Sequence, residues 1–274
     1  MTGRLLVLDE VDSTQDEARR RFIAGTPGPL WVLARQQAAG RGRSGRQWIS
    51  PPGNLHLSLL FRPEVALRRW PEVSLLAALV AHKAAARLLA RAGRRDLRDA
   101  LSLKWPNDVL LHGRKLGGIL LETVRAPGAT DSATPPDAPA TGHVEAGGDG
   151  HRALVIGWGM NLRHAPPPDQ ARWPATSLSE HGVTLHPGLM FEVLRDTFWR
   201  WYQVWQSYGP RNVREAWLKR AHGLGSTLHL RHGGELLSGR FADLGPSGEL
   251  VLELPGGERR MFHAGEIEHV QMDA

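Results

Sequence analysis

Residues 40–54 read GRGRSGRQWISPPGN and lie between two segments with the composition of β-strands, residues 31–34 and 55–61. Three arginines alternate with glycines, which let the main chain approach a ligand closely. Guanidinium groups bind phosphate through paired N–H donors. On extended backbone Arg41 and Arg43 project to the same side. The stretch therefore predicts a loop that holds one nucleotide between two strands.

Three alternatives for this loop remain open. Gly40, Gly42 and Gly45 match the dinucleotide-binding pattern G-x-G-x-x-G, but that pattern must open a helix and residues 48–52, WISPP, do not resemble one. An arginine–glycine segment that binds nucleic acid is usually repeated and disordered, whereas this one occurs once before a strand. A merely solvated basic turn would not account for the motifs described below.

Composition places the chain among ordinary globular proteins. Its 274 residues, 41% of them hydrophobic, are enough for one large domain and a small one. The net charge of +6 permits an acidic partner such as nucleic acid, a nucleotide or an acidic protein. The absence of cysteine excludes disulfides and thiolate chemistry. Because no signal peptide opens the chain and the longest apolar run, residues 73–81, is short, we expect a cytoplasmic protein outside the membrane.

Hydrophobic periodicity predicts alternating strands and helices. The strands are expected at residues 5–8, 31–34, 55–61, 101–105, 109–112, 115–124 and 153–157. Asp12 or Ser13 is expected to cap a helix through residue 23, and residues 74–92 form a second amphipathic helix. Steps of three and four place an apolar stripe on one face of a later helix, consisting of Phe191, Leu194, Phe198, Trp201 and Trp205, and we expect this stripe to be core.

Two changes of composition divide the chain. Residues 125–152 contain no Leu, Ile, Phe, Tyr or Trp, so we expect a disordered insertion within a hairpin. After residue 223, short alternating runs at 227–231, 236–244, 250–254 and 259–262 are joined by tight glycine turns. These runs predict a small antiparallel barrel with a domain boundary near residue 223.

Residues 104–108, KWPND, form a turn in which Pro106 fixes φ and the two polar residues after it bond their own backbone. A simple hairpin between strands is sufficient to account for this segment, and a lone lysine is usually solvated. Lys104 and Lys115 nevertheless add cations to a site that already contains the arginine loop. Lys115, which opens the apolar strand KLGGIL, is the better candidate for a functional lysine.

Five segments occur in the order and approximate spacing of the biotin protein ligase family: STQ (13–15), QAAGRGRSGRQW (37–48), KWPNDVLL (104–111), RKLGGILLE (114–122) and GWGMN (157–161). From about Asp9 to its end, the chain resembles that family. The resemblance implies an α+β (α/β) fold, with a class II aminoacyl-tRNA synthetase/biotin synthetase-like catalytic domain built on a mixed sheet. It places this domain at residues 1–222 and an SH3-like β-barrel at residues 223–274.

The resemblance also implies roles for the matching residues. Those that would bind biotin are Ser13, Thr14, Gln15, Gln37, Arg41, Gly42, Arg43, Lys115, Gly117 and Gly118. Those that would bind ATP and the adenylate are Gly40, Arg41, Arg43, Trp48, Lys104, Asn107 and Asn161. Lys115 and Arg43 would be catalytic, because the reaction joins two anions and needs fixed positive charge. A role for Ser13 as a helix N-cap fits the sequence equally well.

The implied reaction uses biotin and ATP as substrates, with Mg²⁺, and forms biotinyl-5′-AMP. The biotinyl group would then pass to a lysine of a biotin carboxyl carrier protein domain in a biotin-dependent carboxylase. Mg²⁺ would bind mostly through nucleotide phosphates and water, so no metal ligands are assigned. Edge-strand dimers occur in the family, and monomer and homodimer are both open.

Two departures and two alternatives accompany the resemblance. Some relatives carry an N-terminal DNA-binding domain, whereas here the catalytic pattern begins with the first strand, so no DNA partner is expected. Trp158 stands where the family usually has a small or aliphatic residue, which leaves the local pocket shape open. The alternative enzyme is a lipoate or octanoate ligase or transferase. The alternative outside enzymes is a nucleic-acid-binding protein that uses the arginine loop.

Overall fold

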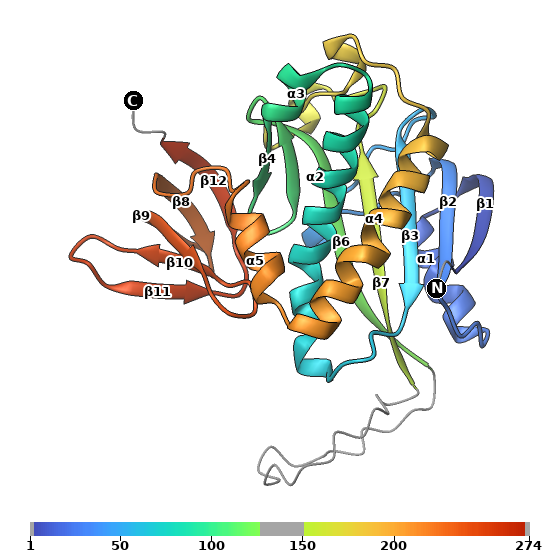
Figure 1. The fold of residues 1–274 in the computed structure, drawn as a ribbon, viewed down its shortest axis with the longest axis horizontal. Coiled ribbons are helices and arrows are strands. Elements are labelled where there is room, and N and C mark those ends of the chain that lie inside the picture. The colour runs from blue at the N-terminus through green and yellow to red at the C-terminus, as the bar shows by residue number, and fades with distance from the viewer. Residues whose placement is uncertain (1–2, 127–150, 272–274) are drawn as a thin grey trace, which may run out of the picture.

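The computed structural model describes residues 3–126 and 151–271. These residues form two β-sheets, with helices packed on the larger sheet (Figure 1). Of the insertion predicted at residues 125–152, residues 127–150 lie outside the described ranges. Its ends are ordered, because Arg125 and Arg152 pair with each other on neighbouring strands. The expected disorder of the insertion therefore stays a prediction.

The larger sheet has seven strands: β1 (Arg4–Val11), β2 (Leu30–Gln37), β3 (Leu55–Phe61), β4 (Leu101–Lys104), β5 (Asp108–Leu111), β6 (Arg114–Arg125) and β7 (Arg152–Met160). Their order in space is β1-β2-β3-β7-β6-β5-β4. β1 and β2 are parallel and the other pairs are antiparallel, so the sheet is mixed as predicted. Because β3 and β7 lie in the interior, their apolar residues are buried nearly throughout.

Helices cover both faces of this sheet. On one face lie α2 (Val73–Arg91) and α4 (Pro187–Tyr208), which cross the central strands (Figure 1). On the other face, α1 (Thr14–Ile23) packs Ala18 and Phe22 against residues of β2, β3 and β7. The predicted N-cap of α1 is confirmed, since the Ser13 hydroxyl accepts a hydrogen bond from the Asp16 N–H at 3.4 Å.

The remaining helices are shorter. They are α3 (Arg95–Asp99), α5 (Arg211–Leu218) and single 3₁₀ turns at Arg43–Gly45, Leu67–Glu72, Pro168–Gln170 and Ser179–His181. They were not predicted from the sequence. α3 and the 3₁₀ turns are too short to show periodicity, whereas α5 is amphipathic, with Val213 and Trp217 buried four residues apart, and was overlooked.

The predicted apolar stripe of α4 is core, with one exception. Phe191, Leu194, Phe198 and Trp205 are buried. Trp201 is only partly buried and lies under the Lys83 ammonium, 4.8 Å from its ring centre. Burial of each large apolar side chain contributes about 2–3 kcal/mol. This stripe therefore supplies much of the stability of the face opposite α1.

Trp158 belongs to the same core. Its ring stacks on Trp31 at 5.8 Å and its indole N–H donates to the Ala77 carbonyl at 3.0 Å. Because side chains alternate across a strand, the neighbours Gly157 and Gly159 face the opposite side of β7. The unusual tryptophan thus packs on the face of the sheet that α2 and α4 cover.

The C-terminal sheet has five antiparallel strands: β8 (Thr227–His232), β9 (Glu235–Leu244), β10 (Leu250–Glu253), β11 (Arg259–Phe262) and β12 (Glu266–Gln271). Their order is β11-β10-β9-β8-β12. Gly233 and Gly234 join β8 to β9 with φ of 58° and 88°, the positive values that a two-residue hairpin turn requires. The sequence analysis missed β12, because Ile267 is its one fully buried residue and charged residues flank it.

One helical segment, Leu67–Arg91, is long and apolar enough to cross a membrane by length and composition. In the structure, 72% of the most apolar 18-residue stretch of this segment is buried inside the protein. The segment therefore acts as a core helix of the larger sheet.

Buried histidine predicts an acid-sensitive fold. His82 on α2 is 3% exposed, and its burial lowers its pKa from 6.5 to about 4. The unfolded chain therefore binds a proton below pH 6.5 that the folded chain refuses until about pH 4. The free energy of unfolding is then highest above pH 6.5 and decreases as the pH falls to 4, by about 3 kcal/mol for this group.

Urea unfolding of a His82→Asn variant measures this contribution. Between about pH 7 and about pH 4.5, the variant should lose less stability than the wild type does. His151→Asn, at an exposed position, is the control and should follow the wild type. An unchanged pH dependence in His82→Asn contradicts the prediction.

Candidate active site

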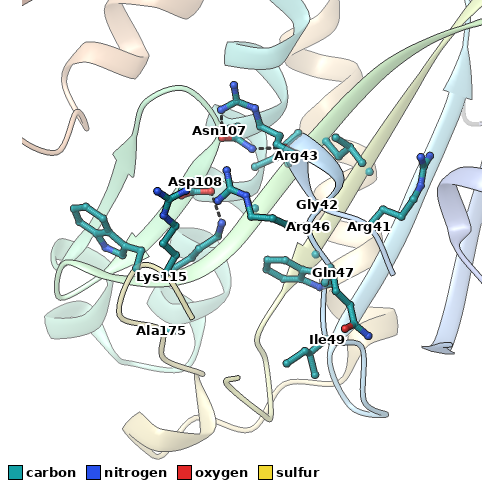
Figure 2. Close-up of a pocket in the computed structure, with 18 of the residues that line it drawn as sticks. Arg41, Gly42, Arg43, Arg46, Gln47, Ile49, Asn107, Asp108, Lys115 and Ala175 are labelled. Carbon is teal, nitrogen blue, oxygen red and sulfur yellow. Dashed lines mark hydrogen bonds and ion pairs between the residues drawn. The ribbon is translucent and has the colours of Figure 1, made fainter. Parts of the chain in front are cut away.

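A cavity of about 600 Å³ opens between β6, β7, the loop of residues 40–48, the β4–β5 turn and β12 (Figure 2). We call residues 40–48 the flap. Most of the predicted site residues line this cavity: Ser13, Thr14, Gln15, Gln37, Arg41, Gly42, Arg43, Trp48, Lys104, Asn107, Lys115, Gly118 and Asn161. Segments as far apart in sequence as α1 and β12 therefore share one site.

Two predicted residues, Gly40 and Gly117, do not line the cavity. A Cβ on Gly40 would lie 2.4 Å from the Trp48 carbonyl oxygen, and one on Gly117 would lie 2.8 Å from the Gly159 carbonyl oxygen. Both glycines are therefore required because two backbone segments of this chain approach closely at these positions, and their role is not contact with a ligand.

Lys104 and Lys115, two of the four lysines in the chain, converge on Asp108. The Lys115 ammonium lies 2.7 Å from Asp108 Oδ1, and the Lys104 ammonium lies 3.1 Å from Oδ2. The β4–β5 hairpin makes this possible, since Lys104 and Asp108 are opposed in its register and Asp108 is opposed to Gly118 on β6. Lys104 also lies 4.5 Å from the Trp173 ring centre.

Burial and charge act in opposite directions at this cluster. Burial raises the pKa of the Asp108 carboxyl, but the two ammonium groups outweigh it and hold the pKa at about 2. Burial lowers the pKa of Lys104, with Asp108 opposing the shift. Burial likewise lowers the pKa of Arg43 on the flap. Two cations against one carboxylate leave a net positive charge in a partly desolvated site, which suits an anionic ligand.

The backbone around Lys115 is held in place. Its N–H donates to the Pro174 carbonyl at 2.6 Å, and its carbonyl accepts from the Thr176 N–H at 3.0 Å. The Asn161 amide donates to the Thr176 carbonyl at 3.2 Å. Asn161 therefore fixes the segment that positions Lys115.

The flap arginines point in different directions (Figure 2). Arg41 and Arg43 were predicted to project to the same side if their backbone is extended, and this condition is not met at Arg43. A 3₁₀ turn begins at Arg43, with Ser44 at φ 56°, so the alternation of a strand does not apply. The Arg43 guanidinium donates to Asn107 Oδ1 at 3.2 Å, whereas Arg41 pairs with Glu122 at 2.7 Å.

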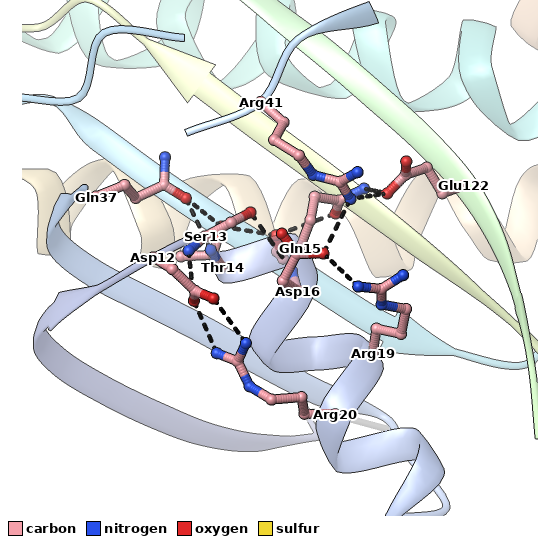
Figure 3. A network of polar contacts seen from close by, with 11 residues as sticks. Asp12, Ser13, Thr14, Gln15, Asp16, Arg19, Arg20, Gln37, Arg41 and Glu122 are labelled. Carbon is pink, nitrogen blue, oxygen red and sulfur yellow. Dashed lines mark hydrogen bonds and ion pairs between the residues drawn. The ribbon is translucent and has the colours of Figure 1, made fainter. Parts of the chain in front are cut away.

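Polar side chains fill the opposite end of the cavity (Figure 3). Gln37 Oε1 accepts from the backbone N–H and the hydroxyl of Thr14 at 2.8 and 3.0 Å. The buried Ser58 hydroxyl contacts Thr14 Oγ1 at 2.8 Å and Gln15 Oε1 at 3.1 Å. Gln37 also donates to Ser50 at 2.8 Å. This network orients paired donors and acceptors next to the apolar floor made by Leu57 and Leu120.

Trp48 lies across β7 between the two ends of the cavity. A Cβ on Gly159 would lie 2.3 Å from its indole, so only glycine leaves room for the ring. The ring centre is 5.5 Å from the Lys115 ammonium. Trp48 therefore packs on the backbone of β7 beside the Lys115 ammonium.

The C-terminal sheet completes the cavity through β12. Glu266 accepts from Arg46 of the flap at 2.7 Å and from Arg172 at 2.9 Å. Arg172 also pairs with Glu268 at 3.0 Å. The described part of the cavity wall thus holds six cationic side chains, Arg41, Arg43, Arg46, Lys104, Lys115 and Arg172, and three carboxylates, Asp108, Glu266 and Glu268.

Sequence reasoning did not single out several of these residues. Asp108 and Glu122 stand inside quoted motifs, KWPND and RKLGGILLE, but nothing in their spacing shows that they meet Lys115 and Arg41. Ser58 lies in the strand LHLSLLF, where a polar residue among apolar ones is a usable signal of a buried hydrogen bond. Trp173 and Glu266 carry no sequence signal for this site.

The chain matches two family models. Residues 7–132 match the biotin/lipoate A/B protein ligase family, and residues 223–270 match the biotin protein ligase C-terminal domain. It is 35% identical to the biotin–[acetyl-CoA-carboxylase] ligase of Paracoccus denitrificans, over 95% of this chain and 98% of that protein. The chain belongs to the biotin protein ligase family. As a member of this family it is an enzyme of the ligase class.

Other family members agree with this assignment. The bifunctional ligase/repressor BirA of Bacillus spizizenii is 29% identical, over 96% of this chain and 74% of that protein. The structure of the Aquifex aeolicus biotin protein ligase in complex with biotin and ATP superimposes with a TM-score of 0.75. It is 22% identical and the match covers 98% of this chain and 99% of that one. The family fold, a mixed α/β catalytic domain followed by an antiparallel sheet, is therefore confirmed.

Proposed function

We propose that this ligase activates biotin with ATP as biotinyl-5′-AMP and then transfers the biotinyl group to a lysine of a biotin carboxyl carrier protein domain. The observation that carries the proposal is the Lys104–Asp108–Lys115 cluster, which shares a cavity with Arg43 and with the polar network around Thr14 and Gln37. The names of the relatives support biotin over lipoate.

In the first step an oxygen of the biotin carboxylate attacks the α-phosphorus of ATP. A new P–O bond forms, the bond to the β-phosphate breaks, and pyrophosphate leaves with its electron pair. Two anions must approach each other, so the protein has to supply fixed positive charge. Lys115 orients the carboxylate, and Arg43 stabilises charge on the phosphoryl oxygens. The ion pair with Asp108 at 2.7 Å fixes the position of the Lys115 ammonium.

In the second step the amine of the carrier lysine attacks the acyl carbon of the mixed anhydride. The amide bond forms, AMP departs with the oxygen that joined it to the acyl group, and the amine releases a proton. Water competes with the amine for the same carbon. A flap that covers the adenylate reduces this side reaction.

The vitamin end of the cavity suits a ureido ring. Such a ring presents one carbonyl acceptor and two N–H donors, and a buried unpaired group would weaken binding. Ser13, Thr14 and Gln37 supply these partners, with Gln15 adjacent. Trp48 and Lys104 lie toward the nucleotide in this proposal, together with Asn107 and Asn161.

Mg²⁺ enters this proposal with the nucleotide. The described carboxylates of the cavity, Asp108, Glu266 and Glu268, are each paired with cations. In the described part of the chain, no group of three or more His, Asp or Glu side chains is arranged to hold a metal ion. The metal would therefore bind through phosphate oxygens and water and would neutralise charge on the leaving pyrophosphate.

The proposal includes the finer expectations that follow from the resemblance. The catalytic domain spans residues 1–222 and the C-terminal domain residues 223–274, in a cytoplasmic enzyme that acts on a carboxylase carrier domain without DNA. Sedimentation of the purified chain, with and without biotin and ATP, distinguishes a monomer from a homodimer.

ATP–pyrophosphate exchange tests the function directly. The purified chain is incubated with labelled pyrophosphate and ATP, and with biotin, lipoate or duplex DNA in separate reactions. We expect exchange that requires biotin and that lipoate and DNA do not support. Exchange that requires lipoate in place of biotin would refute the proposal in favour of a lipoate ligase. Absence of exchange under all conditions, together with binding of the duplex DNA in a gel-shift measurement, would refute it in favour of a nucleic-acid-binding protein.

A further inference from the structure

Glu122, a carboxylate outside the reacting groups, contacts both the flap and the vitamin floor. By vitamin floor we mean the cavity surface formed by Gln15, Leu57 and Leu120. Glu122 Oε2 accepts from the Gln15 amide at 3.1 Å and from the Arg41 guanidinium at 2.7 Å (Figure 3). Gln15 is buried, and a Cβ on Gly157 would touch its amide oxygen, so its side chain crosses the floor beneath β7. Glu122 therefore joins a floor residue to a flap residue.

The flap arginine has a second acidic partner on α1. Arg41 lies 3.2 Å from Asp16 Oδ1, which also pairs with Arg19 at 3.0 Å. The far side of the flap is fastened separately, by Arg46 on Glu266 of the C-terminal sheet. The flap is thus bound at two ends by ion pairs that come from different parts of the fold.

We propose that Glu122 is a positioning residue that fastens the flap over the vitamin floor. This inference rests on the proposed function and deepens it. When Gln15 is oriented across the floor, its amide and the Arg41 guanidinium share one carboxylate oxygen, and the flap is held shut. When Gln15 swings away, the carboxylate loses one of the two donors that orient it, and the flap contact weakens.

The strength of this contact suits a closure that has to reopen. The side chains of Arg41 and Glu122 are 37% and 34% exposed, and an ion pair at that exposure changes an equilibrium by a factor of about 2 to 5. A contact of this size closes the flap for most of the time and still permits substrates to enter. Stronger pairing would trap the product.

Loss of the Glu122 carboxylate should therefore weaken retention of biotin and of the adenylate in the cavity, and should leave the rate of adenylate formation nearly unchanged. In Glu122→Gln the flap opens more often, and we expect hydrolysis of the adenylate to rise about 2- to 5-fold. The KM for biotin should rise several-fold, because the neutral amide that replaces the carboxylate is a weaker acceptor for Gln15. The kcat for pyrophosphate release should stay within about twofold, since Lys115, Arg43 and Asp108 are unchanged.

Limited trypsin digestion of the ligand-free protein tests the contact without any substrate. Cleavage after Arg43 in the flap is followed by mass spectrometry in the wild type, in Glu122→Gln and in Glu10→Gln. Glu10 is an exposed carboxylate on β1 that accepts from Gln36 at 2.7 Å, so the control carries the same chemical change away from the flap. We expect cleavage about 2- to 5-fold faster in Glu122→Gln and unchanged in Glu10→Gln.

A second variant, Arg41→Gln, and the AMP yield of the enzyme assay test the same contact independently. If Glu122→Gln fails to fold, Arg41→Gln removes the same ion pair from the flap side and should also be cleaved faster after Arg43. In the enzyme assay, AMP released per carrier lysine modified should rise in Glu122→Gln. Equal cleavage of Glu122→Gln and Glu10→Gln overturns the inference, whereas absence of biotin-dependent exchange in the wild type overturns only the proposed function.

Discussion

Lys115→Ala is expected to lower biotin-dependent ATP–pyrophosphate exchange by about 10²- to 10³-fold, because it removes the cation that the proposed mechanism assigns to the biotin carboxylate. The fold should survive, since the Lys115 side chain is about a quarter exposed and Lys104 still neutralises Asp108. The loss should appear in kcat as well as in KM for biotin, because the charge acts most strongly in the transition state.

Lys219→Ala is the matched control for this variant. Lys219 is exposed, follows α5 and lies outside the cavity. It should retain wild-type exchange and wild-type urea unfolding. Normal adenylate yield from folded Lys115→Ala would remove Lys115 from the mechanism.

Asp108→Asn is expected to damage both stability and catalysis. The substitution keeps the shape of the side chain but leaves two ammonium groups close together in a buried site without their counter-ion. Removal of one partner from a buried ionic cluster costs about 3 to 5 kcal/mol. Lys115 also loses its anchor, so exchange should fall by about 10²-fold or more. Urea unfolding and pyrophosphate exchange measure the two effects separately.

The pH dependence of this variant identifies the cause of its instability. Burial already lowers the pKa of Lys104, and loss of the Asp108 charge lowers it further. As the pH rises toward 10, the folded variant releases a proton that the unfolded chain still binds, so its deficit relative to wild type should shrink. Asp96→Asn, at an exposed ion pair on α3, is the control. A deficit that stays constant across this range points to lost packing in place of lost charge.

Local patterns predicted most of the secondary structure. The strand at residues 55–61 and the cap of α1 at Ser13 were predicted as they occur, because hydrophobic alternation and capping are short-range signals. Short elements were missed, including α3 and β12. For β12 the reason is that Ile267 is its one fully buried residue and Val270 is only partly buried, so the segment has almost no alternation to detect.

The candidate site was only partly predictable for a different reason. Lys115 and Lys104 were selected as cations, but their common partner Asp108 depends on the register of β4, β5 and β6. Arg41 and Arg43 both line the cavity, but the 3₁₀ turn at Arg43 directs their side chains to different partners. Glu122 stood in a quoted motif without a role until Gln15 and Arg41 were seen to share it.

The sequence by itself determined the family, the order of the elements and the chemical types at the site, because motifs and periodicity depend on residues close together along the chain. Only the tertiary structure decided which charges meet: Lys104 with Lys115 on Asp108, Arg41 on Glu122, and Arg46 on Glu266. Those contacts depend on strand register, on a single turn in the flap and on the docking of a second sheet. Electrostatic energy depends on distances in space, which spacing along the chain does not specify.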